Sequence, residues 1–314
     1  MNIKALGLTL IKKQKVLIAT IILFIISALV SPVFLTPMNL SNLLLQISTY
    51  GIVSIGVMFV MLTGEFDVSV GSILAFSGIY TVMLTNRAGY VVTLLTLLPM
   101  AFIMGSIYGI LVDKIKFNSF VATLGGMYFY RGMGYVLCGA EPVTNKVDVY
   151  AWIGTTEFLG INCISWIFLF GIVLSWFVIT RTTFGRNIMA TGGNYEVAKA
   201  SGIRVSYYKF AVYIICDFCA LLAGMLLASR LSRAVPNAGD DASMSAISSV
   251  VIGGTSMKGG EGGAFQTLLG VFLIGLISNI LNILGVMAYL QQIIKGAILI
   301  IIVCFDRFYR NRAL

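Results

Sequence analysis

Long apolar runs alternate with short polar segments along the whole chain of 314 residues. A helix that crosses a bilayer needs about 20 mostly apolar residues. Ten segments approach this length, and the third and eighth are short. They are 16–35, 43–63, 70–86, 91–112, 118–138, 161–180, 210–232, 243–257, 264–285 and 288–305. The pattern predicts an all-α polytopic membrane protein with about ten spans in one domain, residues 1–314.

Composition agrees with this prediction and excludes several kinds of chemistry. The chain is 59% hydrophobic and 11% charged, whereas a soluble domain carries about 25% charged residues. Histidine is absent, which excludes His-based acid–base, triad and metal chemistry. Cys216 and Cys219 form the one close cysteine pair, and we interpret them as buried small residues. We therefore expect no catalytic residue, no metal site and no cofactor.

The distribution of basic residues predicts the orientation. If the N-terminus is inside, 15 of the 21 Lys and Arg residues fall in inner segments, as the positive-inside rule requires. The net charge of +9 then reflects these segments and does not indicate nucleic-acid binding. Residues 16–35 form a run that is too long for a cleavable signal peptide. We expect both termini to be cytoplasmic.

The longest basic segment between two apolar blocks is residues 181–209, with five basic residues and one acid, Glu196. Asn194 is a good helix N-cap, and Glu196 follows where the helix dipole favours an acid. Gly202 is placed to end the helix in the left-handed conformation. These signals predict a short helix over 195–201. Such a helix is marginal alone in water, so we expect it to dock on this protein or on a partner.

Two glycines precede this short helix. Gly192 and Gly193 predict a tight, flexible turn into it. The segment could also be a plain solvated loop.

Two glycine-rich interruptions, 64–72 and 253–263, lie between short apolar segments and carry acids. Broken helices at corresponding places in two halves of a transporter flank its translocation path. Spans two and seven differ by five, so such halves would have opposite orientations. The pattern predicts two inverted-repeat-like halves.

Charges within the spans are few, and an ionisable group at membrane depth is a candidate for function. We expect Arg131 and Lys295 to snorkel or to bind backbone carbonyls, and Asp217 to pair with a basic residue on another helix. Asp67 is expected to bind backbone N–H groups of its turn or a nearby Lys or Arg. The candidate residues for translocation or gating are Asp67, Ser69, Gly71, Arg131, Asp217, Gly253, Gly254 and Lys295.

Elimination limits the energy source. The sequence has no phosphate-binding Gly-x-x-x-x-Gly-Lys-Ser/Thr loop and no channel filter signature. A pore with a basic inner loop but no energy source of its own suggests a subunit driven by a separate ATPase. A stand-alone ion-coupled carrier of a small solute and a non-transporting scaffold remain open on these grounds.

Five motifs, in order, carry a family resemblance over about residues 49–306. They are Gly64-Glu-Phe-Asp-Val-Ser-Val-Gly-Ser72; Phe120-Val-Ala-Thr-Leu-Gly125 with Tyr130-Arg-Gly132; Arg181-Thr-Thr-Phe-Gly-Arg186 with Gly192-Gly-Asn194 and Ala198-Lys-Ala-Ser-Gly-Ile203; Ser249-Val-Val-Ile-Gly-Gly-Thr-Ser256 with Gly259-Gly260; and Gln291-Gln-Ile-Ile-Lys-Gly296. Together they resemble the inner-membrane permease subunit of ribose/xylose/galactose-type sugar ABC importers. Glu65 departs from the family, which commonly has glycine there, and adds a charge near Asp67.

The resemblance implies an inner (plasma) membrane permease that forms a homo- or heterodimer with a second permease subunit. It also implies a cytoplasmic ATP-binding subunit that docks on 181–209 and a soluble extracytoplasmic sugar-binding protein that delivers the solute. The short helix then becomes a coupling helix. The coupling residues implied are Arg181, Gly185, Arg186, Gly192, Gly193, Asn194, Glu196, Ala198, Lys199, Ser201 and Gly202.

Overall fold

The computed structural model describes residues 15–310, and they are mostly helical. The helices are α2 (Lys15–Val30), α3 (Pro37–Leu62), α4 (Val70–Ala88), α5 (Tyr90–Gly109), a π-helical continuation of α5 (Ile110–Lys114), α6 (Ser119–Cys138), α7 (Asp148–Thr155), α8 (Cys163–Arg181), α9 (Thr183–Gly193), α10 (Tyr195–Ala200), α11 (Val205–Leu231), α12 (Ala242–Gly253), α13 (Ala264–Ile283) and α14 (Ala288–Arg310). Two antiparallel pairs of two-residue strands join β1 (Val143–Thr144) to β4 (Arg233–Ala234) and β2 (Glu157–Phe158) to β3 (Ile161–Asn162).

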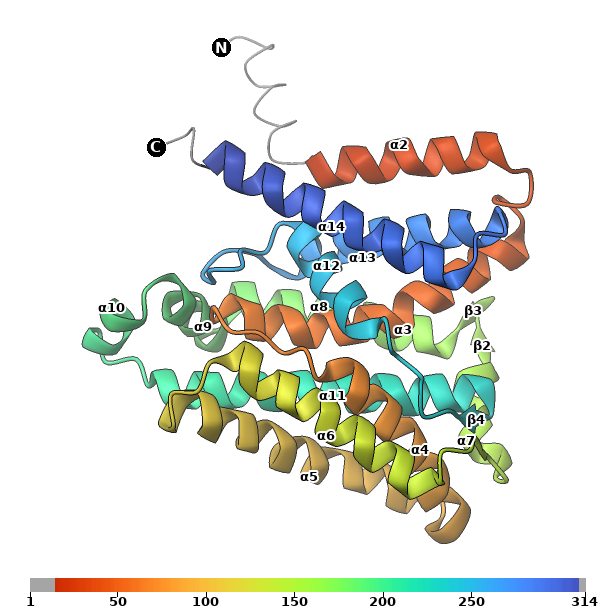
Figure 1. Cartoon of the computed structure of the whole chain (residues 1–314), viewed down its shortest axis with the longest axis horizontal. Helices are drawn as coiled ribbons and strands as arrows, with labels where there is room; N and C mark the ends of the chain where they lie inside the picture. The colour runs from red at the N-terminus through yellow and green to blue at the C-terminus, as the bar shows by residue number, and fades with distance from the viewer. Residues whose placement is uncertain (1–14, 311–314) are drawn as a thin grey trace.

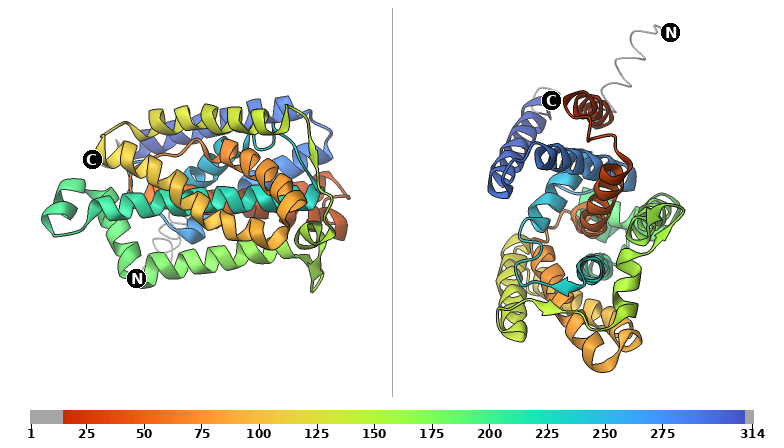
Figure 2. Two further views of the ribbon diagram at one scale, coloured as in Figure 1. Left: turned by 90° about the horizontal axis from the view of Figure 1, so that it is seen from below. Right: turned by 90° about the vertical axis from the view of Figure 1, so that its right-hand side faces the viewer.

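The long helices run roughly alongside one another (Figure 1). Helix α11 is central: it contacts α3, α4 and α5, and it is seen end-on with other helices around it in the right panel of Figure 2. Helices α9 and α10 lie at one end of the molecule, while α7 and the strands lie at the other (Figure 1). The end of α14 points toward the side that carries α10, whereas α2 starts near the middle of the view and runs away from that side (Figure 1).

In the part of the chain that the structure describes, five helical stretches have the length and apolar composition to cross a membrane. They are Pro37–Leu62, Tyr90–Lys114, Cys163–Arg181, Val205–Leu231 and Ala264–Ile283. The chain is thus an all-α polytopic membrane protein, as the hydrophobic pattern predicts.

The predicted boundary between the first two spans is wrong. Helix α2 ends at Val30, five residues before the predicted end, and α3 begins at Pro37 rather than at residue 43. Pro32 has no N–H to continue a helix. Thr36 then caps α3 by accepting a hydrogen bond from the Asn39 backbone N–H, and Pro37 at the first helical position already has a helical φ.

The predicted turn at Gly192 and Gly193 is also wrong. Both residues are the last turn of α9, an 11-residue helix that the sequence did not suggest. Glycine is required at Gly192 for close packing rather than for a turn, because a Cβ there would lie 2.0 Å from the Leu62 carbonyl oxygen.

Two irregular segments break the helical pattern near the centre of the molecule. We call residues 64–69, between α3 and α4, the first broken segment. Residues 232–241, between α11 and α12, form the second. The helices that follow them start beside each other, because the Gly71 N–H donates to Ser243 Oγ at 2.9 Å. Helix α12 has only 12 residues.

Candidate functional site

The first broken segment is held by side chains from three helices. Its backbone N–H groups at Phe66 and Val68 donate to Ser119 Oγ and Thr123 Oγ1 on α6, both at 3.2 Å. The Val68 carbonyl accepts from Ser243 Oγ on α12 at 2.7 Å. The Phe66 carbonyl accepts from the Tyr213 hydroxyl on α11 at 3.3 Å. Irregular backbone at membrane depth is tolerated where such partners replace water.

Two buried acids lie close together at the first broken segment: Asp67 belongs to the segment, and Asp217 belongs to α11. Asp67 is fully buried, and its Oδ1 accepts from the Ser69 N–H at 2.8 Å and from Ser69 Oγ at 2.6 Å. The predicted bond to a backbone N–H is therefore present. Asp217 on α11 is also fully buried and lies within hydrogen-bonding reach of Asp67. The expected basic partner of Asp217 is not found among residues 15–310.

The second broken segment is held by two basic residues of the predicted set. Arg131 on α6 donates to the carbonyls of Pro236 at 2.7 Å and Ala238 at 2.9 Å, as expected for a buried guanidinium, and it forms a salt bridge with Asp240 at 2.9 Å. Arg131 thus fixes the path of this segment from α6.

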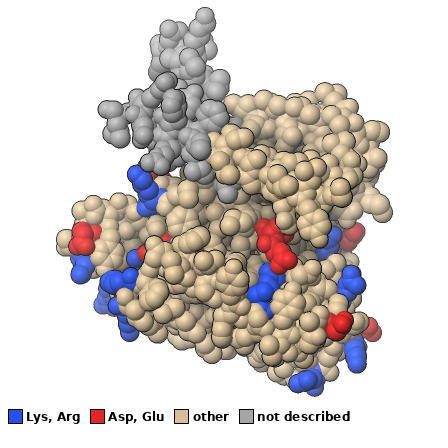
Figure 3. All heavy atoms as spheres, in the orientation of Figure 1, with Lys and Arg blue, Asp and Glu red and all other residues tan. Residues whose placement is uncertain are grey.

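Lys295 on α14 contacts Asp241 at 3.3 Å, and Asp241 also accepts from the Tyr50 hydroxyl at 3.2 Å. Figure 3 shows acidic and basic atoms side by side in the middle of a face that is otherwise largely uncharged between its two ends. The second broken segment is therefore tied to α3, α6 and α14 by charged and polar groups. Gly71 lies directly against it, since a Cβ there would be 2.5 Å from the Gly239 carbonyl oxygen.

Glycines bring three segments together at the end of the molecule that carries α9. The Gly260 N–H donates to the Leu62 carbonyl at 3.0 Å. A Cβ at Gly192 would meet both groups, and one at Gly259 would lie 2.6 Å from the Gly64 nitrogen. We call this contact of α3, α9 and residues 258–260 the glycine junction. It couples the polar segment 181–209 to the start of the first broken segment.

The other two glycines predicted for translocation or gating, Gly253 and Gly254, lie at the C-terminal end of α12. Gly253 packs on α13, because a Cβ there would lie 2.1 Å from the Gln266 carbonyl oxygen. Gly254 ends the helix with a φ of +111°, a conformation that suits glycine.

Helix α10 confirms the local prediction made from Asn194. The Asn194 side chain accepts from the Val197 N–H at 3.1 Å, and Gly202 adopts a φ of +81° just after the helix. Ala198 is the buried residue on the inner face of α10. Glu196 and Lys199 are exposed and form no ion pair within residues 15–310. Charged groups without an internal partner are available to a second protein.

The remaining predicted coupling residues surround α9 and α10. Gly185 is buried where α8 and α9 meet, since a Cβ there would lie 2.4 Å from the Ile179 carbonyl oxygen. Arg181 lies 5.9 Å from the Trp176 ring centre. Arg186 and Ser201 are exposed.

A chain of contacts links α10 to the first broken segment. The Lys209 ammonium lies 5.3 Å from the centre of the Tyr195 ring and forms an ion pair with Glu65. Both charged side chains are largely buried, with 11% exposed for Lys209 and 16% for Glu65. The residue that departs from the family pattern therefore has a basic partner from the start of α11.

A second contact reaches Tyr195 from residues between α5 and α6. The Lys116 ammonium donates to the Tyr195 hydroxyl at 3.4 Å. Partial desolvation lowers the pKa of Lys116, but this hydrogen bond and the nearby Asp113 carboxylate outweigh it and raise the pKa. Lys116 thus stays cationic beside α10.

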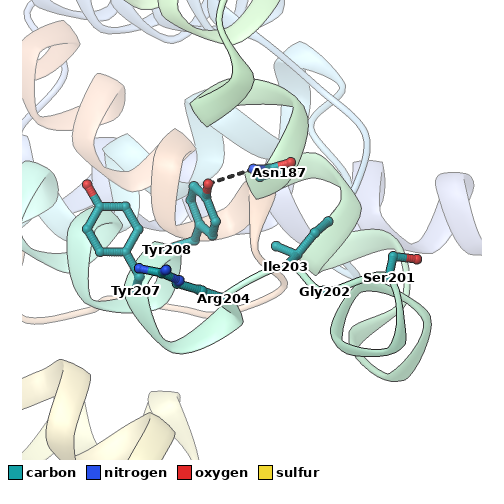
Figure 4. Close-up of a pocket in the computed structure, with 7 residues that line it drawn as sticks. All are labelled: Asn187, Ser201, Gly202, Ile203, Arg204, Tyr207 and Tyr208. Carbon is teal, nitrogen blue, oxygen red and sulfur yellow. Dashed lines mark hydrogen bonds between the residues drawn. The ribbon is translucent and has the colours of Figure 1, made fainter.

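A pocket of about 360 Å³ lies between α9, α10 and α11. Figure 4 shows the Asn187 amide pointing across it to the Tyr208 hydroxyl, to which it donates at 2.6 Å, with Tyr207 and Arg204 on the neighbouring wall. Ser201, Gly202 and Ile203 complete the lining. The pocket opens next to α10.

The chain matches a family model described as "Branched-chain amino acid transport system / permease component" over residues 39–303. This match covers most of the chain. The chain belongs to this permease family. The relatives described next, which are named for the import or transport of sugars, confirm its resemblance to permease subunits of sugar ABC importers.

Three such relatives span nearly the full chain. The ribose import permease protein RbsC of Escherichia coli (strain K12) is 36% identical over 94% of this chain and 93% of its own length. RbsC of Bacillus subtilis (strain 168) is 37% identical over 91% and 90%. The L-arabinose ABC transporter permease protein AraH of Azospirillum brasilense is 32% identical over 96% and 90%. No solved structure matches the chain.

Sequence reasoning missed several residues of the site. Ser243, Tyr108 and Asp241 were not among the candidates, although each contacts or faces a predicted residue. The stretch Arg233-Ala-Val-Pro-Asn-Ala-Gly-Asp-Asp241 combines Pro, Gly and acids before a short apolar segment. Residues 64–72 share the glycine and the acids, although not the proline, and this likeness could have identified the second broken segment.

Proposed function

We propose that this chain is the membrane-embedded permease subunit of an ATP-driven ABC importer that translocates a simple sugar, a pentose, a hexose or a related small polyol. The observation that carries this proposal is the near full-length similarity to permeases named for ribose and arabinose import. A cytoplasmic ATPase subunit supplies the energy, and a soluble extracytoplasmic binding protein delivers the sugar. A second permease subunit, identical or related, completes the membrane part.

The proposed topology has ten spans, formed by α2–α6, α8 and α11–α14, with both termini in the cytoplasm. The basic residues of the inner segments support this orientation, as does the end of α14, which points toward the side of the molecule that carries α10 (Figure 1). We propose that α3–α4 and α11–α12, each with its broken segment, are equivalent parts of two inverted halves. The helices that follow the two broken segments, α4 and α12, meet at Gly71 and Ser243, which supports a translocation path between the halves.

In this proposal α10 is the coupling helix. Its exposed Glu196 and Lys199 bind the ATPase, and movement of α10 reaches the first broken segment through two routes. One is Tyr195, Lys209 and Glu65; the other is the glycine junction. Asp67, Asp217, Arg131 and Lys295 lie on or against the two broken segments and are proposed to control the path.

Co-purification tests the role of α10. The chain is expressed in its native operon context, extracted in mild detergent, and its partners are identified by mass spectrometry. We expect a nucleotide-binding ATPase that is lost when residues 194–202 are deleted and depleted by the double substitution Glu196→Ala and Lys199→Ala. The matched control is Glu141→Ala with Lys146→Ala, an exposed pair of the same charges on the segment after α6, which should retain the ATPase.

Transport measurements complete this test. Deletion of 194–202 should abolish uptake of the sugar while the chain still inserts. Uptake that survives the deletion contradicts the proposal. Uptake that follows an imposed ion gradient without ATP, by the chain alone in liposomes, indicates the stand-alone ion-coupled carrier instead. The absence of any solute flux would indicate a scaffold.

A further inference from the structure

The contact between the side chains of Asp67 and Asp217 has no hydrogen-bond donor if both carboxyl groups are ionised. The two carboxyl groups lie within hydrogen-bonding reach of each other. Asp67 Oδ2 and both oxygens of Asp217 form no hydrogen bond of normal geometry among the described residues, although the Cys216 thiol also lies within reach of Asp67. Two ionised carboxylates can only accept hydrogen bonds, so a contact between them requires a proton on one of the two.

Nothing nearby compensates two negative charges. Both side chains are 0% exposed, and no Lys or Arg side chain among the described residues forms a salt bridge with either of them. The titratable groups that face the two acids are Tyr108 on α5, Tyr130 on α6, and Tyr213, Cys216 and Cys219 on α11. All of them are neutral in their protonated form, so two buried carboxylates side by side would repel each other without a counter-ion.

A second polar group points to the same place. The Tyr108 hydroxyl is buried, and none of its neighbours forms a hydrogen bond of normal geometry with it among residues 15–310. Ser69 and Tyr130 lie within its reach, the two acids lie nearby, and a Cβ at Gly126 would collide with it. Buried polar groups without partners of normal geometry at one place call for a specific explanation.

The surroundings of the two acids differ, and the difference assigns the proton. Asp67 Oδ1 accepts two hydrogen bonds from Ser69 and lies just before the N-terminus of α4. Both features stabilise a carboxylate. Asp217 lies within α11 and accepts no hydrogen bond from the described residues, so its environment favours the neutral acid.

We propose that Asp217 is protonated in the folded protein and donates this proton to Asp67 Oδ2, so that the two acids share one proton. No bond other than this hydrogen bond forms, and the pair carries one negative charge. The shared proton joins the first broken segment to α11, the helix that directly follows the coupling helix. This proton stays bound in the folded protein and stabilises the fold. The proposal does not depend on whether the chain transports a sugar.

Infrared spectroscopy of the purified protein at neutral pH tests the proposal without any transport assay. A protonated carboxyl absorbs in the C=O stretching region, apart from ionised carboxylates, and labelling with ¹³C-aspartate shifts this band. We expect an isotope-sensitive band in the wild-type protein that is lost in Asp217→Asn. It should persist in Asp67→Asn, because Asp217 itself carries the proton.

The matched control is Asp113→Asn. Asp113 is a third buried acid, but its partner is Lys116 at 3.6 Å, so this variant should keep the band. A wild-type spectrum without an isotope-sensitive band overturns the proposal even if no variant folds. A band that survives in Asp217→Asn but disappears in Asp113→Asn also overturns it, because the proton would then reside on Asp113.

Thermal unfolding separates a proton from a metal cation. Asparagine at 217 keeps a donor for Asp67 Oδ2, so Asp217→Asn should melt no lower than the wild type. Asp217→Leu removes the donor and should melt lower. A melting temperature that rises with sodium concentration in the wild type, and no longer does so in Asp217→Asn, assigns a sodium ion to the site and overturns the shared proton.

Discussion

Substitution of Gly192 by alanine should break the glycine junction and separate α9 from the first broken segment. The added Cβ would lie 2.0 Å from the Leu62 carbonyl oxygen and 2.7 Å from the Gly260 nitrogen. Non-bonded carbon atoms prefer about 3.5–4.0 Å, so the backbone must move by more than about 1 Å. Overpacking of this kind costs about 1–3 kcal/mol. Loss of the hydrogen bond from Gly260 to Leu62, 3.0 Å long, adds about 0.5–1.5 kcal/mol.

The total of about 2–4 kcal/mol corresponds to a melting temperature lower by roughly 4–8 °C, at about 2 °C per kcal/mol for a chain of this size. Purified protein in detergent is suited to this measurement, with sugar uptake and ATPase binding measured in parallel. We expect the ATPase to bind through α10 while uptake falls, because the junction lies between the docking helix and the broken segment.

Gly193→Ala is the matched control. It adds the same methyl group one residue later in α9, where nothing lies within 4 Å of the Cβ. Its gain in helix propensity is similar, so the difference between the two variants isolates the contact. The reasoning is refuted if both variants melt and transport alike, or if Gly193→Ala is the more damaging.

Three further substitutions test other parts of the site. Asn194→Ala removes the cap bond to Val197 and should lower the stability of α10 by about 1 kcal/mol. We expect lower sugar-stimulated ATPase activity as a result of weaker coupling, and unchanged activity would contradict the proposed role of α10. Lys209→Met leaves Glu65 largely buried without its partner and should destabilise the protein by about 3 kcal/mol, whereas Lys209→Met with Glu65→Gln should recover most of the melting temperature. Arg131→Lys retains the charge but cannot span two carbonyls and Asp240 with one fork of donors, so uptake should fall while membrane insertion, followed by fractionation, persists; full uptake would remove Arg131 from the site.

The local preferences of individual residues made the bounds of α10 predictable. Asn194 and Gly202 bracket α10 in the structure as their side-chain and backbone preferences require. The positions of the apolar runs also agree closely with the long helices, since membrane insertion demands a continuous apolar segment.

Contacts between distant segments were not predictable in this way. The pairing of Glu65 with Lys209 and of Arg131 with Asp240 depends on how the helices pack, and a single sequence does not contain that information. Gly192 shows the same limit: its local preference for turns was apparent, but its use as a helical contact depends on Leu62, 130 positions earlier in the chain.

The shortness of α12 bears on how the chain is made. Twelve residues give a helix of about 18 Å, well short of the roughly 30 Å of the hydrocarbon layer. The insertion machinery cannot release such a helix into lipid alone, and α12 is preceded by a segment with two acids. It packs against α3, which is synthesised earlier, and against α13 and α14, which are synthesised later. The packing around α12 is therefore complete only after the last two helices have been made.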